Sequence, residues 1–366
     1  MPLKTANRAD ARPRKGRGAG INPEGRFERI ERERYDDGWA TGDDDLPPPL
    51  KTHVTVEHAK SIISRNSSPD VPFSQSINPY RGCEHGCIYC YARPSHAYVN
   101  LSPGVDFETR LFAKVNAPEL LRAELARPGY RCEVISLGAN TDPYQPVERE
   151  YRITRGVLEV LEDCDHPVGI VTKNAMVERD IDILARMAKK NLATVFVSLN
   201  NLDHELARRL EPRCSAPARR LEAMRRLSDA GIPTGVIVAP VIPFLTDHQI
   251  EPVLEAAYTV GARSAGYVLM RLPWEVKELF RDWLETHYPL KARHVMSRVH
   301  QMRGDRDNDP QFGSRMSGTG ELAGLLRKRF DIACARLGFN ARDWELDTTR
   351  FRAPAQPGAT AQLALF

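Results

Sequence analysis

From about residue 71 onward, short apolar runs alternate with segments of helical periodicity. The apolar runs are rich in β-branched residues and too short for helices, which is typical of parallel strands buried on both faces. They cover residues 74–78, 132–138, 167–172, 193–199, 232–239 and 264–269. The helical segments between them cover residues 116–125, 149–163, 177–190, 218–230 and 248–260. This alternation predicts an α/β protein built from about six βα units.

The arrangement we expect for residues 71–272 is a partial (β/α)6 parallel barrel. A closed eight-unit barrel needs about 250 residues, which is more than this region offers. An open Rossmann sheet is the alternative, but no G-x-G-x-x-G motif follows a predicted strand. Helical patterns at residues 274–287, 291–302 and 320–337 then predict a C-terminal helical extension over residues 273–340.

Both ends of the chain read differently from this core. Residues 1–20 are basic, an acidic run follows at residues 36–45, and three prolines stand at residues 47–49. Polar segments this poor in apolar residues cannot offset the entropy of ordering, so we expect residues 1–55 to form a disordered arm. Residues 354–366 are rich in Ala, Pro and Gln and predict a flexible tail.

Composition limits the class of protein without identifying it. The 366 residues are 42% apolar and 27% charged, as in ordinary soluble proteins. The most apolar stretch, residues 235–245, is interrupted by Pro240 and Pro243 and is too short to span a membrane. No apolar segment follows the N-terminal arginines, so a secretory signal is not expected. We therefore predict a cytoplasmic protein in a reducing setting, with no membrane partner.

The net charge of +4 neither requires nor excludes a nucleic-acid partner. A basic arm can bind phosphates, but it can equally serve as a solubilising tail. Four arginines near the expected site could also contact a polyanion, namely Arg81, Arg93, Arg213 and Arg271. No known DNA- or RNA-reading module is recognisable in the chain. Nucleic acid therefore remains one possible partner among several.

The most informative motif is the run N-P-Y-R-G-C-E-H-G-C-I-Y-C-Y-A-R, which places Cys83, Cys87 and Cys90 within eight residues. Thiolates on a tight loop are the usual ligands of iron–sulfur clusters, and a cubane normally takes four of them. Three ligands at this spacing leave one iron open to bind a substrate or cofactor. We therefore interpret the three cysteines as ligands of a [4Fe-4S] cluster.

Other readings of this loop predict different chemistry. A structural zinc site usually uses two separated pairs of ligands, and His85 beside three thiols would make a cramped set. Disulfides are disfavoured by the odd count of seven cysteines. The cluster could also serve only electron transfer or structure. The remaining cysteines, Cys132, Cys164, Cys214 and Cys334, stand singly and are expected to pack as small apolar groups.

The cysteine motif resembles that of the radical S-adenosylmethionine (SAM) superfamily. That resemblance implies a cluster whose open iron chelates SAM and whose electron cleaves it to a 5′-deoxyadenosyl radical. It also implies an electron donor, for which we expect a flavodoxin- or ferredoxin-like protein. Because loops at the carboxyl ends of parallel strands converge, the residues expected to bind SAM follow those ends. They are Asn140, Thr141, Lys173, Ser198, Asn200 and Ala239.

Further motifs sharpen the resemblance over about residues 71–272. The run T-D-P-Y-Q-P and the later T-K, S-L and G-I-P elements are similar to the branch that contains spore photoproduct lyase. Carried over by position, the resemblance implies cluster ligation by the three cysteines. It implies SAM binding by Tyr89, Thr141, Lys173 and Ser198, with Ala239 near the adenine. Tyr91 resembles a tyrosine that takes part in radical transfer in the lyase.

One departure from that branch concerns the residue that quenches the product radical. The lyase has a hydrogen-donating cysteine just before the pair that matches Thr141 and Asp142, whereas this chain has Gly138, Ala139 and Asn140 there. We therefore predict radical generation without predicting spore photoproduct repair. Simpler roles also stay open: Ser198 and Asn200 could cap the following helix, and Glu148 and Arg155 could form an ion pair.

Overall fold

The computed structural model describes residues 16–27, 50–341 and 345–355. Its main element is a seven-stranded sheet of order β10-β9-β8-β7-β6-β3-β2. The six predicted strands are all present and pair in parallel with their neighbours. They are β3 (Gln75–Ile77), β6 (Ile135–Leu137), β7 (Val168–Thr172), β8 (Ala193–Ser198), β9 (Thr234–Val241) and β10 (Ser264–Leu269). The antiparallel edge strand β2 (Ile63–Arg65) pairs with β3.

The parallel strands follow the sheet in chain order from β3 to β10. A doubly wound Rossmann sheet would reverse its strand order part-way, so this order argues against that alternative. The result is a mixed α/β fold with a parallel sheet, and the curvature of a partial barrel stays a prediction. All six carboxyl ends lie at one edge of the sheet, because the strands are parallel. We call this edge the carboxyl edge.

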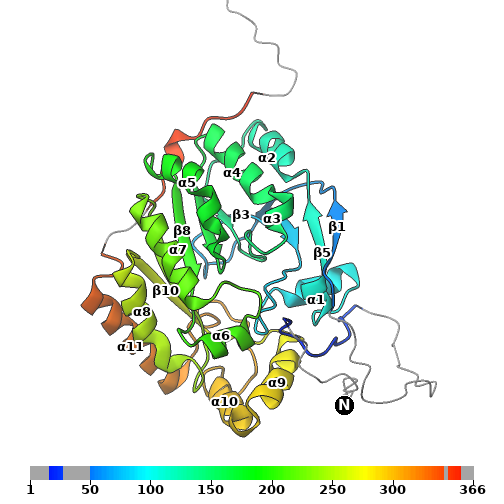
Figure 1. Ribbon diagram of the computed structural model, residues 1–366, viewed down its shortest axis with the longest axis vertical. Coiled ribbons are helices and arrows are strands. Elements are labelled where there is room, and N and C mark those ends of the chain that lie inside the picture. Colours follow the sequence, from blue (N-terminus) through cyan, green and yellow to red (C-terminus); the bar gives the residue numbers. More distant parts are fainter. Residues whose placement is uncertain (1–15, 28–49, 342–344, 356–366) are drawn as a thin grey trace, which may run out of the picture.

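Helices connect successive strands, as the periodicity predicts (Figure 1). The connecting helices are α2 (Ala117–Leu125), α3 (Glu148–Tyr151), α4 (Ile153–Asp163), η3 (Ala175–Asp180), α5 (Ile181–Ala188), α6 (His204–Leu210), α7 (Pro217–Asp229), η4 (Asp247–Gln249) and α8 (Ile250–Thr259). The helix predicted at residues 149–163 is two helices, because Arg152 takes a left-handed conformation with φ of 51°. The segment predicted at residues 177–190 begins as a 3-10 turn before α5.

A second, three-stranded sheet of order β1-β5-β4 precedes the first connecting helix and was not predicted. It contains β1 (His53–Glu57), β4 (Tyr80–Arg81) and β5 (Arg110–Lys114). Two short helices, η2 (Arg93–Val99) and α1 (Asp106–Thr109), lie between β4 and β5. β4 contains only two residues, and β1 is largely exposed, so neither has the apolar run that marks a buried strand. This sheet matters because β4 leads directly into the cysteine motif.

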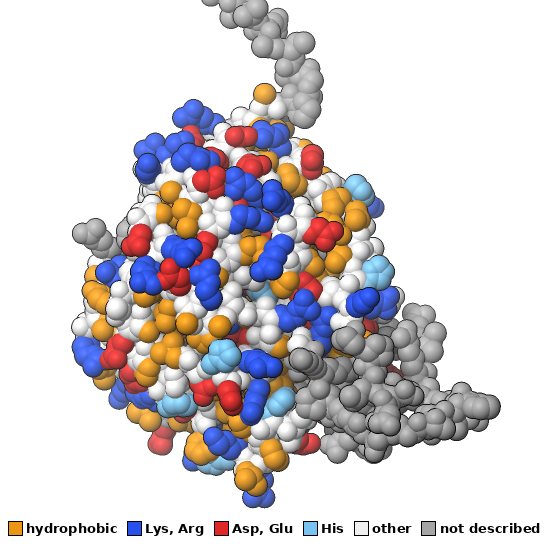
Figure 2. All heavy atoms as spheres, in the orientation of Figure 1, with side chains coloured by type: hydrophobic (Ala, Val, Ile, Leu, Met, Phe, Trp, Pro, Cys, Tyr) orange, Lys and Arg blue, Asp and Glu red, His pale blue; other side chains and the backbone are white. Residues whose placement is uncertain are grey.

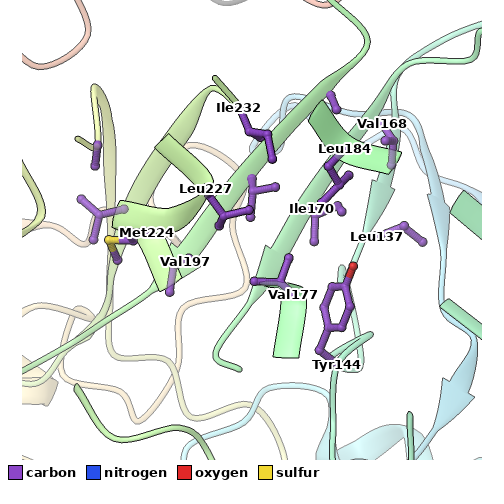
Figure 3. Packing of buried hydrophobic residues seen from close by; sticks show 14 of the residues in the cluster. Leu137, Tyr144, Val168, Ile170, Val177, Leu184, Val197, Met224, Leu227 and Ile232 are labelled. Carbon is purple, nitrogen blue, oxygen red and sulfur yellow. The ribbon is translucent and has the colours of Figure 1, made fainter. Parts of the chain in front are cut away.

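The main core lies between the parallel sheet and its connecting helices. Figure 3 shows Leu137, Ile170 and Val197 from three neighbouring strands, with Leu184 from α5 and Leu227 from α7 on the same side. All five side chains are at most 1% exposed. Such close-packed apolar burial fixes the strands and so fixes the loops at the carboxyl edge.

The predicted C-terminal extension is helical, with α9 (Val276–His287), α10 (Pro289–Gln301), α11 (Gly320–Leu337) and a short η5 (Thr348–Arg350). It is divided between two places (Figure 1). α11 packs against α8 and β10, whereas α9 and α10 pack against each other. Side chains of α9 and α10 share a core with Cys87, Ile88 and Tyr89. The extension therefore helps to hold the cysteine motif in place.

Residues 16–27 fall within the arm for which the composition predicts disorder, yet they pack against the body of the protein. Ala19 is 1% exposed and shares a core with Cys87 and Ile88. The remainder of the predicted arm before residue 50, and the tail from residue 356, lie outside the described residues. Among the helices of the described ranges, none has the length and apolar character needed to cross a membrane.

Candidate active site

The cysteine motif forms a loop (residues 82–92, the cluster loop) whose backbone is fixed from several sides. The Cys83 amide donates to the Phe107 carbonyl at 2.9 Å, and the Ile88 amide donates to the Leu210 carbonyl at 3.1 Å. The Gln145 side chain bonds the backbone on both sides of Cys83, at Gly82 and Glu84. Because these contacts come from separate elements, the loop has a defined shape before any cofactor binds.

A buried ion pair supports the inner side of the cluster loop. Arg93 and Glu108 are both 0% exposed and form a salt bridge. Arg93 also donates to the carbonyl of Cys87 at 2.9 Å, while Glu108 accepts from the amides of Gly18 and Ala19, each at 2.9 Å. Residues 16–27, which we call the N-terminal strap, are thus tied to the loop through one carboxylate. Removing either charge would leave the other buried and uncompensated.

The three thiols of the motif are free and largely buried. Cys83 and Cys87 are 7% and 8% exposed, and none of the three forms a disulfide. Burial and the neighbouring sulfurs raise the pKa of Cys90 to about 12. Among the residues that the structure describes, no three His, Cys, Asp or Glu side chains form a closed group that could hold a metal ion. The donor chemistry fits an iron–sulfur cluster, and convergence of the thiols on one cluster belongs to the proposal below.

A fourth thiol lies beside Cys87. The Cys214 sulfur is 3.7 Å from the Cys87 sulfur, and this contact is the main cause of a lowered pKa of Cys87. Cys214 packs against the apolar core that contains Cys87, as the sequence predicted for a small apolar group. The sequence did not indicate its contact with the Cys87 sulfur, because Cys214 belongs to a loop 127 residues further along the chain, with no local pattern to mark it.

His85, in the middle of the cluster loop, belongs to a polar network at the carboxyl edge. Its Nδ1 lies 3.3 Å from the Asp142 carboxylate, and its Nε2 lies 3.1 Å from the Asn174 amide nitrogen. Burial alone would lower the pKa of His85, but the Asp142 carboxylate and the Cys83 sulfur raise it well above its usual value. Asp142 also accepts from the Lys173 amide at 2.7 Å. The network joins the loop to the ends of β6 and β7.

A second chain of contacts joins the cluster loop to the end of β8. The Tyr89 hydroxyl donates to the Glu211 carboxylate, which also pairs with Arg220. Arg220 is 1% exposed and donates to the carbonyls of Ser198, at 2.9 Å, and Ser215, at 2.7 Å. Burial alone would raise the pKa of Glu211, but the charges of Arg220 and Lys173 hold it below the usual range. The sequence did not indicate either Glu211 or Arg220 as a site residue.

Lys173 lies where the two chains of contacts meet. Burial alone would lower the pKa of its ammonium group, but Cys87, Glu211 and Cys214 together raise it. Its carbonyl accepts from the Ser215 amide at 3.3 Å, which holds the loop after α6 against the end of β7. Lys173 therefore lies near Cys87 and Glu211, and its role in binding SAM stays a prediction.

The remaining candidates at the carboxyl edge differ in what they can still bind. Thr141 is buried, and its hydroxyl donates to the Tyr80 carbonyl at 3.0 Å, whereas the Asn140 side chain is exposed. Ser198 is buried and its hydroxyl donates to the Ala239 carbonyl at 3.3 Å. Asn200 is 1% exposed, and its amide nitrogen has no hydrogen-bond partner among the described residues. A buried donor without a partner is costly, which points to a ligand.

The simpler roles considered for Ser198 and Asn200, and for the Glu148–Arg155 pair, do not occur in the structure. The N-cap of α6 is Asp203, whose carboxylate accepts from the amides of Glu205 and Leu206, so neither Ser198 nor Asn200 caps it. Glu148 pairs with Arg179 rather than with Arg155. Arg155 instead pairs with Asp180 and with two exposed carboxylates.

Tyr91 lies on the outer side of the cluster loop and is 52% exposed. Its hydroxyl donates to the Ala139 carbonyl in the loop after β6. Burial of the hydroxyl and the nearby Cys90 sulfur raise the pKa of Tyr91 to about 12. The positive charges of Lys173 and Arg271 lower the pKa of the same hydroxyl, so both cations lie near Tyr91. It is therefore positioned between the cluster loop and the carboxyl edge.

This geometry agrees with a match between residues 77–257 and the radical SAM superfamily. The chain is a member of the radical SAM superfamily. The matched region contains the cysteine motif and the parallel strands of the seven-stranded sheet, except β10 and the first two residues of β3. The family implies a [4Fe-4S] cluster and SAM as cofactors and radical chemistry as the type of reaction.

Curated relatives extend this finding without naming a substrate. An uncharacterised protein of Mycobacterium tuberculosis is 37% identical over 221 residues, which is 60% of this chain and 65% of the relative. One from Methanocaldococcus jannaschii is 26% identical over 65% of this chain and 85% of its own length. A radical SAM Nalpha-GlyT isomerase of Pseudomonas phage M6 is 25% identical over 57% of this chain and 44% of the isomerase. The chain thus spans slightly less than two thirds of the mycobacterial relative.

Solved structures of spore photoproduct lyase share the fold of this radical SAM chain. One, complexed with dinucleoside spore photoproduct, has a TM-score of 0.57 at 15% identity and covers 78% of this chain and 80% of the lyase. A lyase variant with bound AdoMet has a TM-score of 0.54 over the same shares. At this identity the likeness concerns the fold alone.

Proposed function

We propose that this chain is an enzyme that cleaves SAM reductively and abstracts hydrogen from a bound substrate. Cys83, Cys87 and Cys90 would hold the [4Fe-4S] cluster. When bound, the cluster supplies one electron that cleaves SAM to methionine and a 5′-deoxyadenosyl radical. The observation that carries the proposal is that two chains of contacts join the cluster loop to the carboxyl edge of the parallel sheet. One runs from His85 through Asp142 to the Lys173 amide, and the other runs from Tyr89 through Glu211 to Arg220.

The chain's own residues would bind and orient SAM at this edge. Lys173 supplies a partly buried cation for a carboxylate, and Asn200 supplies an unpaired amide donor. Ser198 and Ala239 lie side by side at the ends of β8 and β9, where an adenine could contact their backbone. Asn140 and Thr141 flank the same edge, and Tyr89 is held in place by Glu211. Tyr91 is exposed toward this region and is the candidate for contact with the substrate.

The test is anaerobic reconstitution with iron and sulfide, followed by dithionite, SAM and chromatography for 5′-deoxyadenosine. The wild type and the matched control Cys132→Ala are expected to form the nucleoside, whereas Cys90→Ala is not. A protein that loads iron but leaves SAM intact would support electron transfer instead. A colourless protein that holds zinc would support the zinc-stabilised alternative. A flavodoxin- or ferredoxin-like protein is the proposed physiological electron donor.

Nucleic acid is the substrate class for which the structure offers specific observations, although three of the four candidate arginines are paired internally. Arg81 pairs with Glu57, Arg93 with Glu108 and Arg213 with Glu84. Figure 2 shows Lys and Arg interspersed with Asp and Glu on one face of the molecule. The mixed charges on this face and the internal pairing of these three arginines weaken the case for a polyanionic substrate.

Arg271 differs from the other three because no carboxylate in the described ranges forms an ion pair with it. Its Nε has no hydrogen-bond partner, and one terminal nitrogen lies 3.5 Å from the Met316 sulfur. Burial, followed by the charge of Arg315, lowers the pKa of Arg271. A partly buried cation without a counter-ion is unfavourable, so an anionic group of the substrate would stabilise it. Arg271 follows β10 and thus lies at the carboxyl edge.

An exposed aromatic cluster nearby would suit unpaired bases. Trp274 and Tyr98 are 63% and 69% exposed, and the Arg26 guanidinium lies 4.4 Å from the Trp274 ring centroid. The rings of Phe27 and Tyr98 are 5.2 Å apart between centroids. Aromatic and arginine side chains are the usual platform for single-stranded nucleic acids. Peptides and small anionic metabolites remain the alternative substrates.

A further inference from the structure

The cluster loop and the loop after α6 run side by side, and two backbone hydrogen bonds hold them together. The Ile88 amide donates to the Leu210 carbonyl at 3.1 Å, and the Arg213 amide donates to the His85 carbonyl at 3.2 Å. These bonds flank Cys87 on one segment and end next to Cys214 on the other. The two cysteines are thus held opposite each other by the backbone, 127 residues apart in sequence.

The sulfur atoms of Cys87 and Cys214 are 3.7 Å apart, and both thiols are free. A disulfide bond is about 2.05 Å long, so bonding requires the sulfurs to approach by less than 2 Å. Two side chains on loops that already lie side by side can make such an approach by small rotations about their Cα–Cβ bonds. Packing reinforces the register, because a Cβ on Gly86 would lie 3.1 Å from the Pro212 ring.

Cys214 lines a cavity through which small molecules can reach its thiol. The cavity has a volume of about 190 Å3 and is lined by residues of α6, α7 and the loop between them, including Glu211, Cys214 and Arg220. Such a space admits a peroxide or the tip of a small thiol. Cys214 is also the more accessible of the pair, because it is partly exposed whereas Cys87 is buried. Cys214 is therefore the sulfur that an oxidant or reductant would reach.

We propose that Cys87 and Cys214 form a reversible disulfide when the cluster is absent. With hydrogen peroxide as oxidant, both S–H bonds and the O–O bond break and one S–S bond forms. The two thiols lose two electrons and two protons, and the peroxide becomes two molecules of water. A dithiol reverses the step by thiol–disulfide exchange. In a reducing cell such a bond would be transient, as intracellular redox disulfides are.

The disulfide would control when the cluster loop accepts iron. This consequence rests on the proposed function, because it takes Cys87 as a cluster ligand. An oxidised Cys87 has no thiolate to offer, so iron cannot bind there until the bond is reduced. At the same time the bond would protect Cys87 from irreversible oxidation to the sulfinic or sulfonic acid. Cys214 thus acts as a resolving thiol for a ligand of the cluster.

The disulfide itself is tested on the cluster-free protein. The full chain is treated with equimolar hydrogen peroxide, remaining thiols are alkylated, and the protein is cleaved with trypsin. Cleavage after Arg213 and Arg219 releases Cys214 on the peptide 214–219. We expect this peptide to be joined to the cluster-loop peptide through Cys87, and to be freed by dithiothreitol. An alkylated Cys214 beside a bond between two cluster-loop cysteines would refute the proposal.

Iron uptake provides an independent readout. After the same peroxide treatment, the wild type is expected to lose most of its capacity to take up iron and sulfide, and dithiothreitol should restore it. Cys214→Ser should retain more of that capacity, whereas the matched control Cys132→Ser should behave like the wild type. Equal loss in Cys214→Ser and wild type would overturn the control of iron uptake by the disulfide, and equal recovery of the two with dithiothreitol would overturn the protective role. If untreated protein takes up no iron, the cluster proposal fails, while the peptide measurement still decides the disulfide.

Discussion

Gly18 of the N-terminal strap lies against the carbonyl oxygen of Gly86 in the cluster loop, so closely that a Cβ on Gly18 would come within 1.8 Å of it. The two residues are brought together by Glu108, whose carboxylate accepts from the Gly18 amide. A segment that is distant from the motif in the sequence thus covers one side of the loop. Since Ala19 shares its core with Cys87, the strap also shields that cysteine from solvent.

Gly18→Ala is expected to destabilise the packing of the strap on the cluster loop by about 1–3 kcal/mol, because the methyl group meets backbone rather than a movable side chain. Urea unfolding should report the loss of free energy, and hydrogen exchange should quicken at the Ile88 amide. Gly324→Ala is the control, since a Cβ there meets nothing within 4 Å in an exposed turn of α11. It should be neutral or stabilising by up to about 1 kcal/mol. Equal free energies of unfolding and equal hydrogen exchange in the two variants would show that the packing of the strap does not stabilise the cluster loop.

Glu211→Gln is expected to lower the free energy of unfolding by roughly 3–5 kcal/mol, because it leaves the buried Arg220 without a counter-charge. The loss should also weaken the hold on Tyr89, whose hydroxyl donates to Glu211. Denaturant unfolding measures the effect. The control is Glu205→Gln, whose carboxylate is 81% exposed and 3.6 Å from Arg209. That change should cost no more than about 0.5 kcal/mol. A similar, small cost for both variants would contradict the role of the buried pair.

Stability should fall as the pH drops from about 6.5 toward 4, in part because of two buried histidines. Burial lowers the pKa of His96 and of His166 to about 4, whereas an unfolded histidine titrates near 6.5. Between these pH values the unfolded chain binds protons that the folded chain does not. Proton binding therefore stabilises the unfolded state relative to the folded state. Each histidine would contribute at most about 3 kcal/mol to this loss, and its contribution is fully present above pH 6.5.

The measurement is the free energy of unfolding in urea at several pH values between 4 and 7.5, compared between wild type and His166→Gln. His166 is 0% exposed, and its Nδ1 lies 3.0 Å from the Pro167 carbonyl, a contact that a glutamine amide can replace. The variant should show a shallower pH dependence over this range. His248→Gln, at a side chain 65% exposed, should keep the wild-type slope. An unchanged slope in His166→Gln would mean that folding does not lower the pKa of this histidine.

The parts of the fold that could be predicted are those marked by a local pattern. Strands buried on both faces, such as β8 and β9, are recognisable in the sequence as continuous runs rich in β-branched residues. β1 and β4 do not, because one is largely exposed and the other has two residues. The helix predicted at residues 149–163 is broken at Arg152 by a backbone conformation that no periodicity reveals. The conformation of these segments is set by tertiary contacts, which the local sequence pattern does not show.

The candidate site divides in the same way. Cys83, Cys87 and Cys90 are recognisable because their spacing is local, and Lys173 because it directly follows a strand. Glu211, Arg220 and Cys214 come from loops and helices that meet the cluster loop only in three dimensions. Their residue types are common and their spacing is unremarkable, so only the structure shows that they surround Tyr89 and Cys87. The disulfide proposed above could not have been inferred without it.

Arg271→Gln tests whether nucleic acid is the substrate class. If the unpaired guanidinium binds a phosphate, labelled single-stranded oligothymidine should bind the wild type, and the variant should bind several-fold more weakly. The dependence of log affinity on log salt should also become shallower by about 0.7 unit, the value for one lost phosphate contact on a single strand. Fluorescence anisotropy over a range of salt concentrations measures both. Arg213→Gln is the matched control, because Arg213 is already paired with Glu84 at 3.2 Å and should contribute little. Equal weakening in both variants would indicate a diffuse charge effect. No binding by the wild type would favour the peptide or small-metabolite alternatives, for which Arg271 would hold a carboxylate instead.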